Sequence, residues 1–170
     1  MCLELETSRL ILRPFRDEDA ALLFELDNDF EVIRYTGDVS YKNIEEALHF
    51  IRNYEQYEKY QMGRLNVFAR QSGEYIGWFG LKYLSDIKEV DLGYRLLKQS
   101  WGKGYATEAS TACLDYGFKI LNLKKIIATA MEANTASIRV FEKLGLKYSH
   151  DNDCGGQPGV VYSIIKEEWK

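Results

Sequence analysis

Runs of alternating or wholly apolar side chains predict seven β-strands in this chain. The strands cover residues 9–13, 65–70, 75–83, 90–97, 126–131, 146–149 and 160–166. The Ser72-Gly73 turn joins the second and third strands into a hairpin. Beside the fourth strand, Glu89 falls on the same face as Asp91 and Arg95, because successive side chains of a strand point to opposite faces.

Apolar side chains at helical spacing predict four helices. The first follows Asp17, which is expected to cap it, and the second begins at Asn43 with Glu46 as its capping-box partner. The third covers about residues 105–121, where small side chains predict close packing against a sheet. The fourth spans residues 135–144 and is ended by a glycine.

The predicted order of elements is β-α-α-β-β-β-α-β-α-β-β, in which strands and helices alternate only in the second half. That order predicts an α+β fold with a mixed sheet flanked by helices, rather than a doubly wound parallel sheet. Only two prolines occur, and no proline-, serine- or glycine-rich linker divides the chain. We therefore expect residues 1–170 to form a single domain.

Charge and composition argue against nucleic-acid binding, a membrane span and a metal site. The 22 Lys and Arg against 26 Asp and Glu give a net charge of −4, which provides no basic footprint for nucleic acid. No apolar run approaches the roughly 18 residues of a membrane span, and the first residues lack the pattern of a secretory signal. Three widely spaced cysteines and two histidines predict free thiols and no metal site. A cytoplasmic protein that binds neither nucleic acid nor membrane is expected.

The candidate chemistry lies in a glycine-rich segment between the strand at 90–97 and the helix at 105–121. Gly102 and Gly104 let the backbone approach a ligand without a Cβ in the way. The start of the helix offers free N–H groups and the positive end of the helix dipole, and Lys103 adds a charge. This combination predicts a diphosphate site. On the two glycines alone, a tight turn without a ligand is the simpler interpretation.

Two known phosphate motifs do not fit this segment. A P-loop lysine is followed by Ser or Thr, whereas Lys103 precedes Gly104. The dinucleotide fingerprint requires a glycine at position 107, where Thr107 stands.

The segment instead resembles motif A of the GNAT N-acetyltransferase superfamily. The chain as a whole resembles the RimJ/RimL-like branch of that superfamily, which is named for enzymes that acetylate ribosomal-protein N-termini. The matching pieces occur in family order at residues 6–14, 35–37, 91–94, 101–109, 134–146 and 162–166. The resemblance implies a mixed, mostly antiparallel central sheet, acetyl-CoA as co-substrate and an amine as acceptor.

The resemblance also implies where acetyl-CoA binds. The cofactor is expected in a V-shaped opening between the strands at 90–97 and 126–131, with its thioester on backbone groups of the first strand and its pyrophosphate on the glycine-rich turn. The implied binding residues are Tyr94, Leu96, Leu97, Gln99, Gly102, Lys103, Gly104, Tyr105, Ala106 and Asn134.

For catalysis the resemblance implies direct attack of the amine, so a base or a water chain must remove a proton. Asp91, two residues before the strand glycine, is the preferred base, and Glu89 shares its face. An exposed carboxylate on a solvated strand face is the alternative. Asn134 and Ser137 are expected to contact the CoA arm or a water near the sulfur. Phe141 stands where many superfamily members have a tyrosine acid, so the thiolate proton is expected from solvent or through Ser137.

For the acceptor the resemblance points to Tyr35, Thr36 and Trp78. Either a protein or peptide α-amine or a small amine such as a polyamine fits the branch. A non-catalytic acyl-CoA-binding or sensory domain is the alternative function, motivated by Phe141. A homodimer is compatible with the fold.

Overall fold

The computed structural model describes residues 3–170, whose strands form an eight-stranded sheet in the order β1-β2-β3-β4-β5-β6-β8-β7. The strands are β1 (Leu5–Glu6), β2 (Leu10–Pro14), β3 (Arg64–Ala69), β4 (Tyr75–Leu84), β5 (Glu89–Leu96), β6 (Lys125–Met131), β7 (Lys147–Asp153) and β8 (Pro158–Ile165). The α-helices are α1 (Ala20–Asn28), α2 (Phe30–Ile33), α3 (Ile44–Arg52), α4 (Gln56–Tyr60), α5 (Tyr105–Asp115) and α6 (Thr135–Lys143). The predicted α+β class and the predicted order of the longer elements are confirmed.

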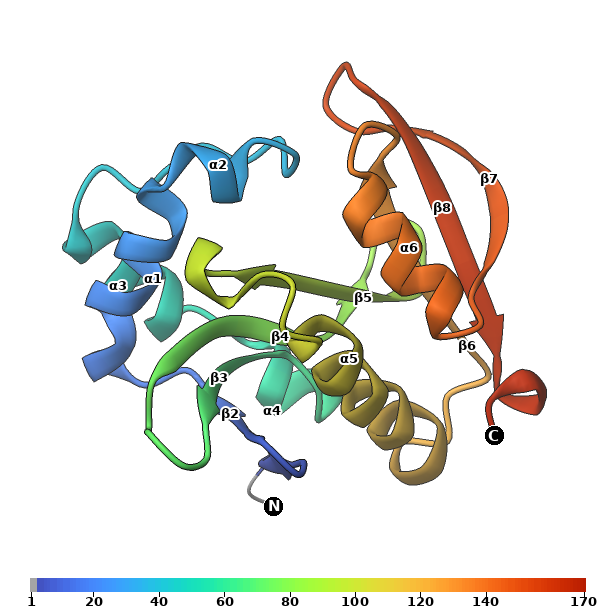
Figure 1. Cartoon of the computed structure of the whole chain (residues 1–170), viewed down its shortest axis with the longest axis horizontal. Coiled ribbons are helices and arrows are strands. Elements are labelled where there is room, and N and C mark those ends of the chain that lie inside the picture. Colours follow the sequence, from blue (N-terminus) through green and yellow to red (C-terminus); the bar gives the residue numbers. More distant parts are fainter. Residues whose placement is uncertain (1–2) are drawn as a thin grey trace.

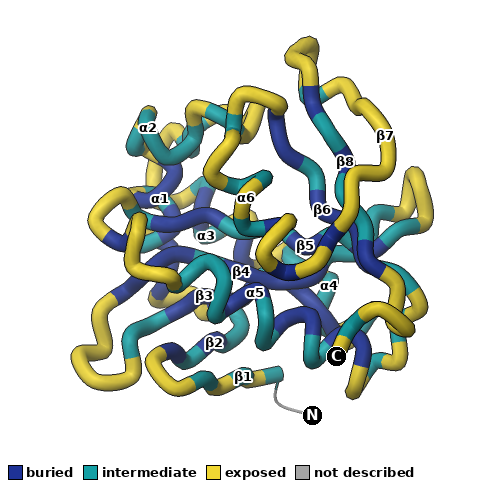
Figure 2. The backbone as a smooth tube through the Cα atoms, turned by 45° about the vertical axis from the view of Figure 1, so that its right-hand side comes forward, coloured by how far each residue is buried: buried dark blue, intermediate teal, exposed yellow. Residues whose placement is uncertain are grey.

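Two apolar clusters lie on opposite faces of the sheet. The larger contains sheet residues such as Leu65, Phe79 and Leu92 and is covered by α5 and α6. The smaller joins Phe15 to α1 and α3 and receives the side chain of Trp78. Neighbouring residues Trp78 and Phe79 therefore point to different clusters, as strand alternation requires. Figure 2 shows the buried backbone concentrated in the central strands, where both faces are covered.

The opening expected in the sheet lies between β5 and β6. All other neighbouring strands are antiparallel, whereas β5 and β6 run parallel and, along the described strands, pair only at Asp91 opposite Ile127. Beyond that position the two strands diverge. In Figure 1, α1, α2 and α3 lie at one end of the molecule, and α6 with the β7–β8 hairpin lies at the other.

Two local predictions are wrong. Asp17 does not cap the first helix; it lies in a short 3-10 helix (Asp17–Asp19), and its carboxylate accepts hydrogen bonds from Arg52 instead. Asn43 does cap α3, but the carboxylate of Glu46 accepts from the Lys42 N–H, one residue before the position of a capping box.

The helix predicted at about 105–121 is confirmed, but its last turn differs from the first part. It is α-helical to Asp115 and continues as a π-helix over Tyr116–Ile120. The predicted close packing of its small side chains is confirmed. A Cβ on Gly117 would lie 2.8 Å from Ile126 Cδ1 and 2.9 Å from Leu81 Cδ1.

Candidate active site

A cavity of about 620 Å³ extends from the glycine-rich turn along β5 and α6 to α2. Of the predicted site residues, ten line it: Tyr35, Thr36, Tyr94, Leu96, Gly102, Gly104, Tyr105, Ala106, Asn134 and Ser137. These residues come from four separate parts of the sequence, so the fold brings the predicted cofactor turn and part of the predicted acceptor site into one space.

The other predicted residues lie outside the cavity lining. Leu97 donates its N–H to the Ile76 carbonyl oxygen at 3.0 Å, and the Lys103 carbonyl accepts from Arg9 Nη1 at 3.0 Å. Gln99 is exposed in the turn. Trp78 is enclosed between two guanidinium groups, 5.4 Å from Arg64 and 5.3 Å from Arg95. This packing does not fit the expected contact of Trp78 with an acceptor.

The two predicted bases form ion pairs. The Asp91 carboxylate is bonded to Arg64, and both side chains are nearly buried, with exposed fractions of 13% and 12%. Glu89 is paired with Lys125. A carboxylate held by an arginine has its lone pairs engaged in charge-assisted hydrogen bonds. The geometry therefore favours a structural role for both carboxylates over the predicted role as bases.

Arg95, a buried residue of β5 that lines the cavity, pairs with two carboxylates. Its guanidinium binds Asp27 of α1 and Asp38 of the segment that follows α2. Desolvation raises the pKa of Asp27, although the charge of Arg95 opposes this shift. Arg95 thus links α1 to the segment after α2. These ion pairs hold the side of the cavity that contains Tyr35 and Thr36.

The glycine-rich turn has the backbone geometry that the sequence predicts. Gly102 and Gly104 have φ angles of 73° and 81°, in the region that favours glycine. Gly104 directly precedes α5, so the unpaired N–H groups of the first helical turn lie beside the cavity. An anion bound there would accept hydrogen bonds from these N–H groups and would be stabilised by the positive end of the helix dipole.

The sequence analysis did not predict the contacts between Glu108 and the N-terminal segment that hold this turn. Glu108, in the first turn of α5, accepts hydrogen bonds from Thr7, Ser8 and the Arg9 backbone, and pairs with the Arg9 side chain. The Arg9 guanidinium also lies 4.7 Å from the Tyr105 ring centroid. The N-terminal segment therefore holds the turn in place.

Besides Arg95, three cationic residues that were not predicted line the cavity: Arg34 of the α2 region, and Arg139 and Lys143 of α6. Arg139 and Lys143 are four residues apart, so they lie one above the other on the same helix face. Their spacing was a signal in the sequence. Together with the turn, they make this end of the cavity suited to several phosphate groups.

The region near Asn134 and Ser137 is arranged by capping. Asn134 Oδ1 accepts from the Ser137 N–H at 3.2 Å and so begins α6. The Tyr94 hydroxyl reaches from β5 to Ser137 Oγ at 3.1 Å. Phe141 is buried in the larger apolar cluster, as is Cys113. Burial raises the pKa of the Cys113 thiol to about 12, so it is not a nucleophile at neutral pH.

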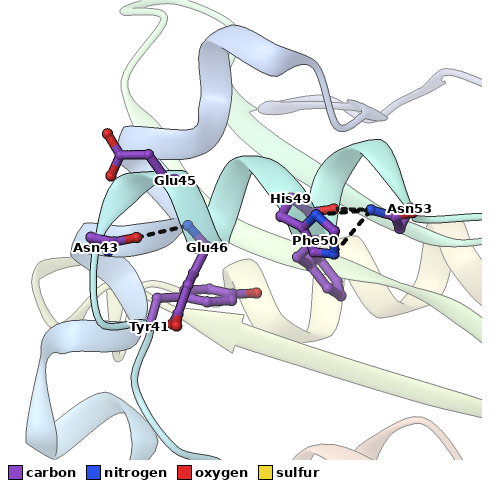
Figure 3. Close-up of a pocket in the computed structure, with 7 residues that line it drawn as sticks. All are labelled: Tyr41, Asn43, Glu45, Glu46, His49, Phe50 and Asn53. Carbon is purple, nitrogen blue, oxygen red and sulfur yellow. Dashed lines mark hydrogen bonds between the residues drawn. The ribbon is translucent and has the colours of Figure 1, made fainter.

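Among residues 3–170, two further hollows have volumes comparable to that of the cavity. One, of about 720 Å³, runs along α3, where Asn43 caps the helix and Asn53 contacts His49 (Figure 3). The Asn43 and Asn53 side chains form hydrogen bonds with the backbone at the two ends of α3. The second, of about 580 Å³, shares Arg34 and Tyr35 with the main cavity and continues toward Glu132.

Comparison with known proteins agrees with this geometry. A family profile described as an acetyltransferase (GNAT) domain matches residues 9–147. An uncharacterized N-acetyltransferase, YoaA of Bacillus subtilis, is 32% identical over 95% of this chain and 96% of its own. The crystal structure of a GNAT-family acetyltransferase from Bacillus anthracis aligns with a TM-score of 0.83 at 26% identity, over 98% of this chain and all of the other.

A third comparison concerns a structure that contains ligands. The spermidine N-acetyltransferase of Vibrio cholerae, in complex with CoA and spermine, aligns with a TM-score of 0.80. It is 21% identical over 95% of this chain and 98% of the other, so the similarity shows a shared fold. No helix among residues 3–170 has the length and apolar character needed to cross a membrane.

Proposed function

The chain belongs to the GNAT acetyltransferase family, in its RimJ/RimL-like branch, and we propose that its cavity delivers the acetyl group of acetyl-CoA to a small cationic amine. The family membership makes it an acetyl-CoA-dependent N-acetyltransferase. The observation that carries the proposal is the cavity itself, because it joins the glycine-rich turn to a separate region that holds Tyr35 and Glu31. Phe141 motivates the alternative of a non-catalytic binding domain, and turnover of acetyl-CoA in the test below would reject it.

The cofactor would lie with its pyrophosphate on the N–H groups that follow Gly102 and Gly104. The positive φ angles of these glycines and the start of α5 support this placement. Arg139 and Lys143 are placed to attract the remaining phosphate. Guanidinium and ammonium groups at one end of the cavity thus fix the direction in which the cofactor lies.

The thioester would lie beside β5, past the position where pairing with β6 stops at Asp91. From there on, backbone groups on that side of β5 are available to a ligand instead of a neighbouring strand. An N–H near Tyr94 would stabilise the oxyanion of the tetrahedral intermediate. One such donor is worth about 3–4 kcal/mol in other acyl-transfer enzymes.

The reaction we infer is direct attack by the neutral amine on the thioester carbonyl carbon. The carbon–nitrogen bond forms, the carbon–sulfur bond breaks, and its electron pair goes to sulfur. Because Asp91, Glu89 and Asp27 are all held by cationic partners, we assign removal of the amine proton to water at the open end of the cavity.

The acceptor would enter past Tyr35 from the second hollow. Glu132 lines the adjoining hollow and has no ion pair in the described residues, whereas Glu31 lines the main cavity and makes an exposed ion pair with Arg34. An acceptor with a second positive charge suits this arrangement. A spermidine N(1)-acetyltransferase of Escherichia coli, 29% identical over 79% of this chain and 70% of its own, supports the same class.

The test is release of free CoA thiol from acetyl-CoA in the presence of polyamines, N-terminal peptides, amino acids or aminoglycosides, with the protein's own cysteines subtracted. We expect polyamines to give the highest kcat/KM. Glu132→Gln should raise the KM for the amine and leave the KM for acetyl-CoA unchanged. Glu25→Gln, on the exposed face of α1, is the matched control. Faster turnover with peptides would reject the small cationic acceptor.

A further inference from the structure

Two hydroxyl groups from opposite sides of the opening meet inside the cavity. Tyr94 lies on β5 and Ser137 on α6, and the Tyr94 Oη atom is 3.1 Å from Ser137 Oγ. Both residues line the cavity. The contact therefore spans the opening between the two halves of the sheet, next to the backbone groups assigned above to the thioester.

Both partners are held in place by other contacts. The Tyr94 ring stacks on Phe79, with centroids 4.9 Å apart and planes 15° apart, and Phe79 is fully buried. Ser137 is fixed at the start of α6, where its N–H donates to Asn134 Oδ1. Neither side chain needs to reorganise to keep the hydroxyl contact, which is the condition for preorganised stabilisation of charge.

The direction of the hydrogen bond follows from the chemistry of the two groups. Burial raises the pKa of Tyr94 to about 12, so its phenol is protonated at neutral pH. The phenol donates to Ser137 Oγ, and the proton of the Ser137 hydroxyl is then free to be donated elsewhere. Phe141, one helical turn further along α6, has no proton to donate and is buried in the core.

We propose that Tyr94 is a positioning residue for the leaving group: by donating to Ser137 Oγ, it directs the Ser137 hydroxyl proton toward the sulfur of acetyl-CoA. The inference rests on the proposed placement of the thioester beside β5. As the carbon–sulfur bond breaks, its electron pair goes to sulfur and the Ser137 hydroxyl hydrogen-bonds the developing thiolate. The proton that completes the thiol is the one lost by the amine, so Tyr94 and Ser137 keep their own protons.

The first test needs no acceptor. Free CoA is bound to the protein, and its thiol is titrated by the ultraviolet absorbance of the thiolate, with the protein alone as reference. A hydrogen bond to the thiolate lowers the pKa of the bound thiol. We expect Tyr94→Phe and Ser137→Ala each to raise that pKa by about half a unit to one unit, equivalent to a threefold to tenfold change.

The double variant distinguishes a linked pair from two separate effects. If Tyr94 acts through Ser137, Tyr94→Phe adds no further shift in the Ser137→Ala background. Tyr162→Phe is the matched control, because its hydroxyl meets Glu142 on the exposed side of α6. An unchanged thiol pKa in Tyr94→Phe, or additive shifts in the double variant, would overturn the proposal.

Turnover gives an independent second measurement. With any amine that the wild-type protein acetylates, Tyr94→Phe should lower kcat by about threefold to tenfold, the effect of one neutral hydrogen bond. The Kd for acetyl-CoA and the Tm should stay at their wild-type values. A parallel loss of cofactor affinity, Tm and kcat would show a purely structural role and reject the proposal. If the wild type acetylates no tested amine, the proposed acceptor fails, while the thiol titration still decides the role of Tyr94.

Discussion

Arg64 and Asp91 are joined across strand β4: Arg64 Nη1 lies 3.0 Å from the Asp91 carbonyl oxygen, and Nη2 is bonded to the Asp91 carboxylate. The guanidinium lies close over Gly93, where a Cβ would be 2.5 Å from Arg64 Nη2. The strand glycine therefore makes room for the arginine. This relationship turns the predicted catalytic carboxylate into one half of a nearly buried ion pair.

Replacing Asp91 by Asn should therefore affect folding more than chemistry. The change leaves the Arg64 charge nearly buried without its partner, and we expect a loss of about 3 kcal/mol in the free energy of unfolding, measured with urea. The kcat should stay within about threefold of the wild-type value. If Asp91 were the general base, its loss would lower kcat by about a hundredfold or more.

The matched control for Asp91→Asn is Glu89→Gln. Glu89 is paired with Lys125, whose side chain is 41% exposed, so its loss should cost less than about 1 kcal/mol. A collapse of kcat in Asp91→Asn with unchanged stability would restore Asp91 as the base.

The glycine turn gives a second prediction. Gly104→Asp should lower the affinity for CoA by about a hundredfold, because it places a negative charge and a side chain beside the expected pyrophosphate. Isothermal titration with CoA measures this change. Gly73→Asp is the control: Gly73 has a similar φ angle of 70° in the β3–β4 turn, and a Cβ there meets nothing within 4 Å. Equal losses of affinity in both variants would mean that backbone strain alone explains the effect.

Glu108 predicts a pH dependence of stability. Desolvation alone would raise the pKa of Glu108, but hydrogen bonds from Thr7, Arg9 and Ser8 outweigh it and lower the pKa below 4.5. A carboxyl group of this kind stabilises the fold fully above its unfolded pKa, and the contribution is lost as the pH falls through its folded pKa. Glu108→Gln should therefore be less stable than wild type at pH 7, and the difference should shrink as the solution is acidified below about pH 4.5.

Urea unfolding of both proteins across that pH range measures the Glu108 effect. Glu45→Gln, at an exposed position of α3, controls for the loss of one surface charge. A constant difference between Glu108→Gln and wild type at every pH would contradict the prediction.

The cationic pair on α6 predicts salt-dependent cofactor binding. Arg139→Ala and Lys143→Ala should each weaken CoA binding by about tenfold at low ionic strength, and less at high salt, where exposed charges are screened. An acetyl thioester of pantetheine, which lacks the nucleotide phosphates, should bind both variants as it binds wild type. Lys147→Ala, on the exposed strand β7, should bind CoA normally. A matching loss for the pantetheine thioester would place the two residues away from the phosphates.

The fold was largely predictable because its main elements carry their patterns locally. The β3–β4 hairpin and the β5 strand alternate clearly, and each helix of nine or more residues has apolar spacing or a capping signal. Helices α2 and α4, with four and five residues, and the two-residue β1 are too short to show a period. The Asp17 prediction failed because the same residue type that caps a helix also pairs with a distant arginine.

In the site, too, local features were predictable from the sequence and long-range contacts were not. The turn at Gly102 and Gly104 was predictable because its function lies in consecutive backbone groups. The contact of Arg9 with Glu108 joins residues 99 positions apart, and the pairing of Arg64 with Asp91 joins separate strands. Single-sequence patterns contain no signal for such partners. The motif around Asp91 therefore predicted a base, whereas the ion pair with Arg64 favours a structural role.

The single pairing between β5 and β6 has a consequence for the life of the protein in a cell. Strands β1 to β5 form one half of the sheet, and β6, β8 and β7 form the other. A cofactor that lies in the opening between β5 and β6 would contact both halves. Binding to the folded state alone adds about 2.7 kcal/mol to the free energy of unfolding when the ligand is at a hundred times its Kd. The fraction of molecules exposed to proteases would then fall as acetyl-CoA rises. The co-substrate would thus protect the enzyme from degradation by occupying the opening in its sheet.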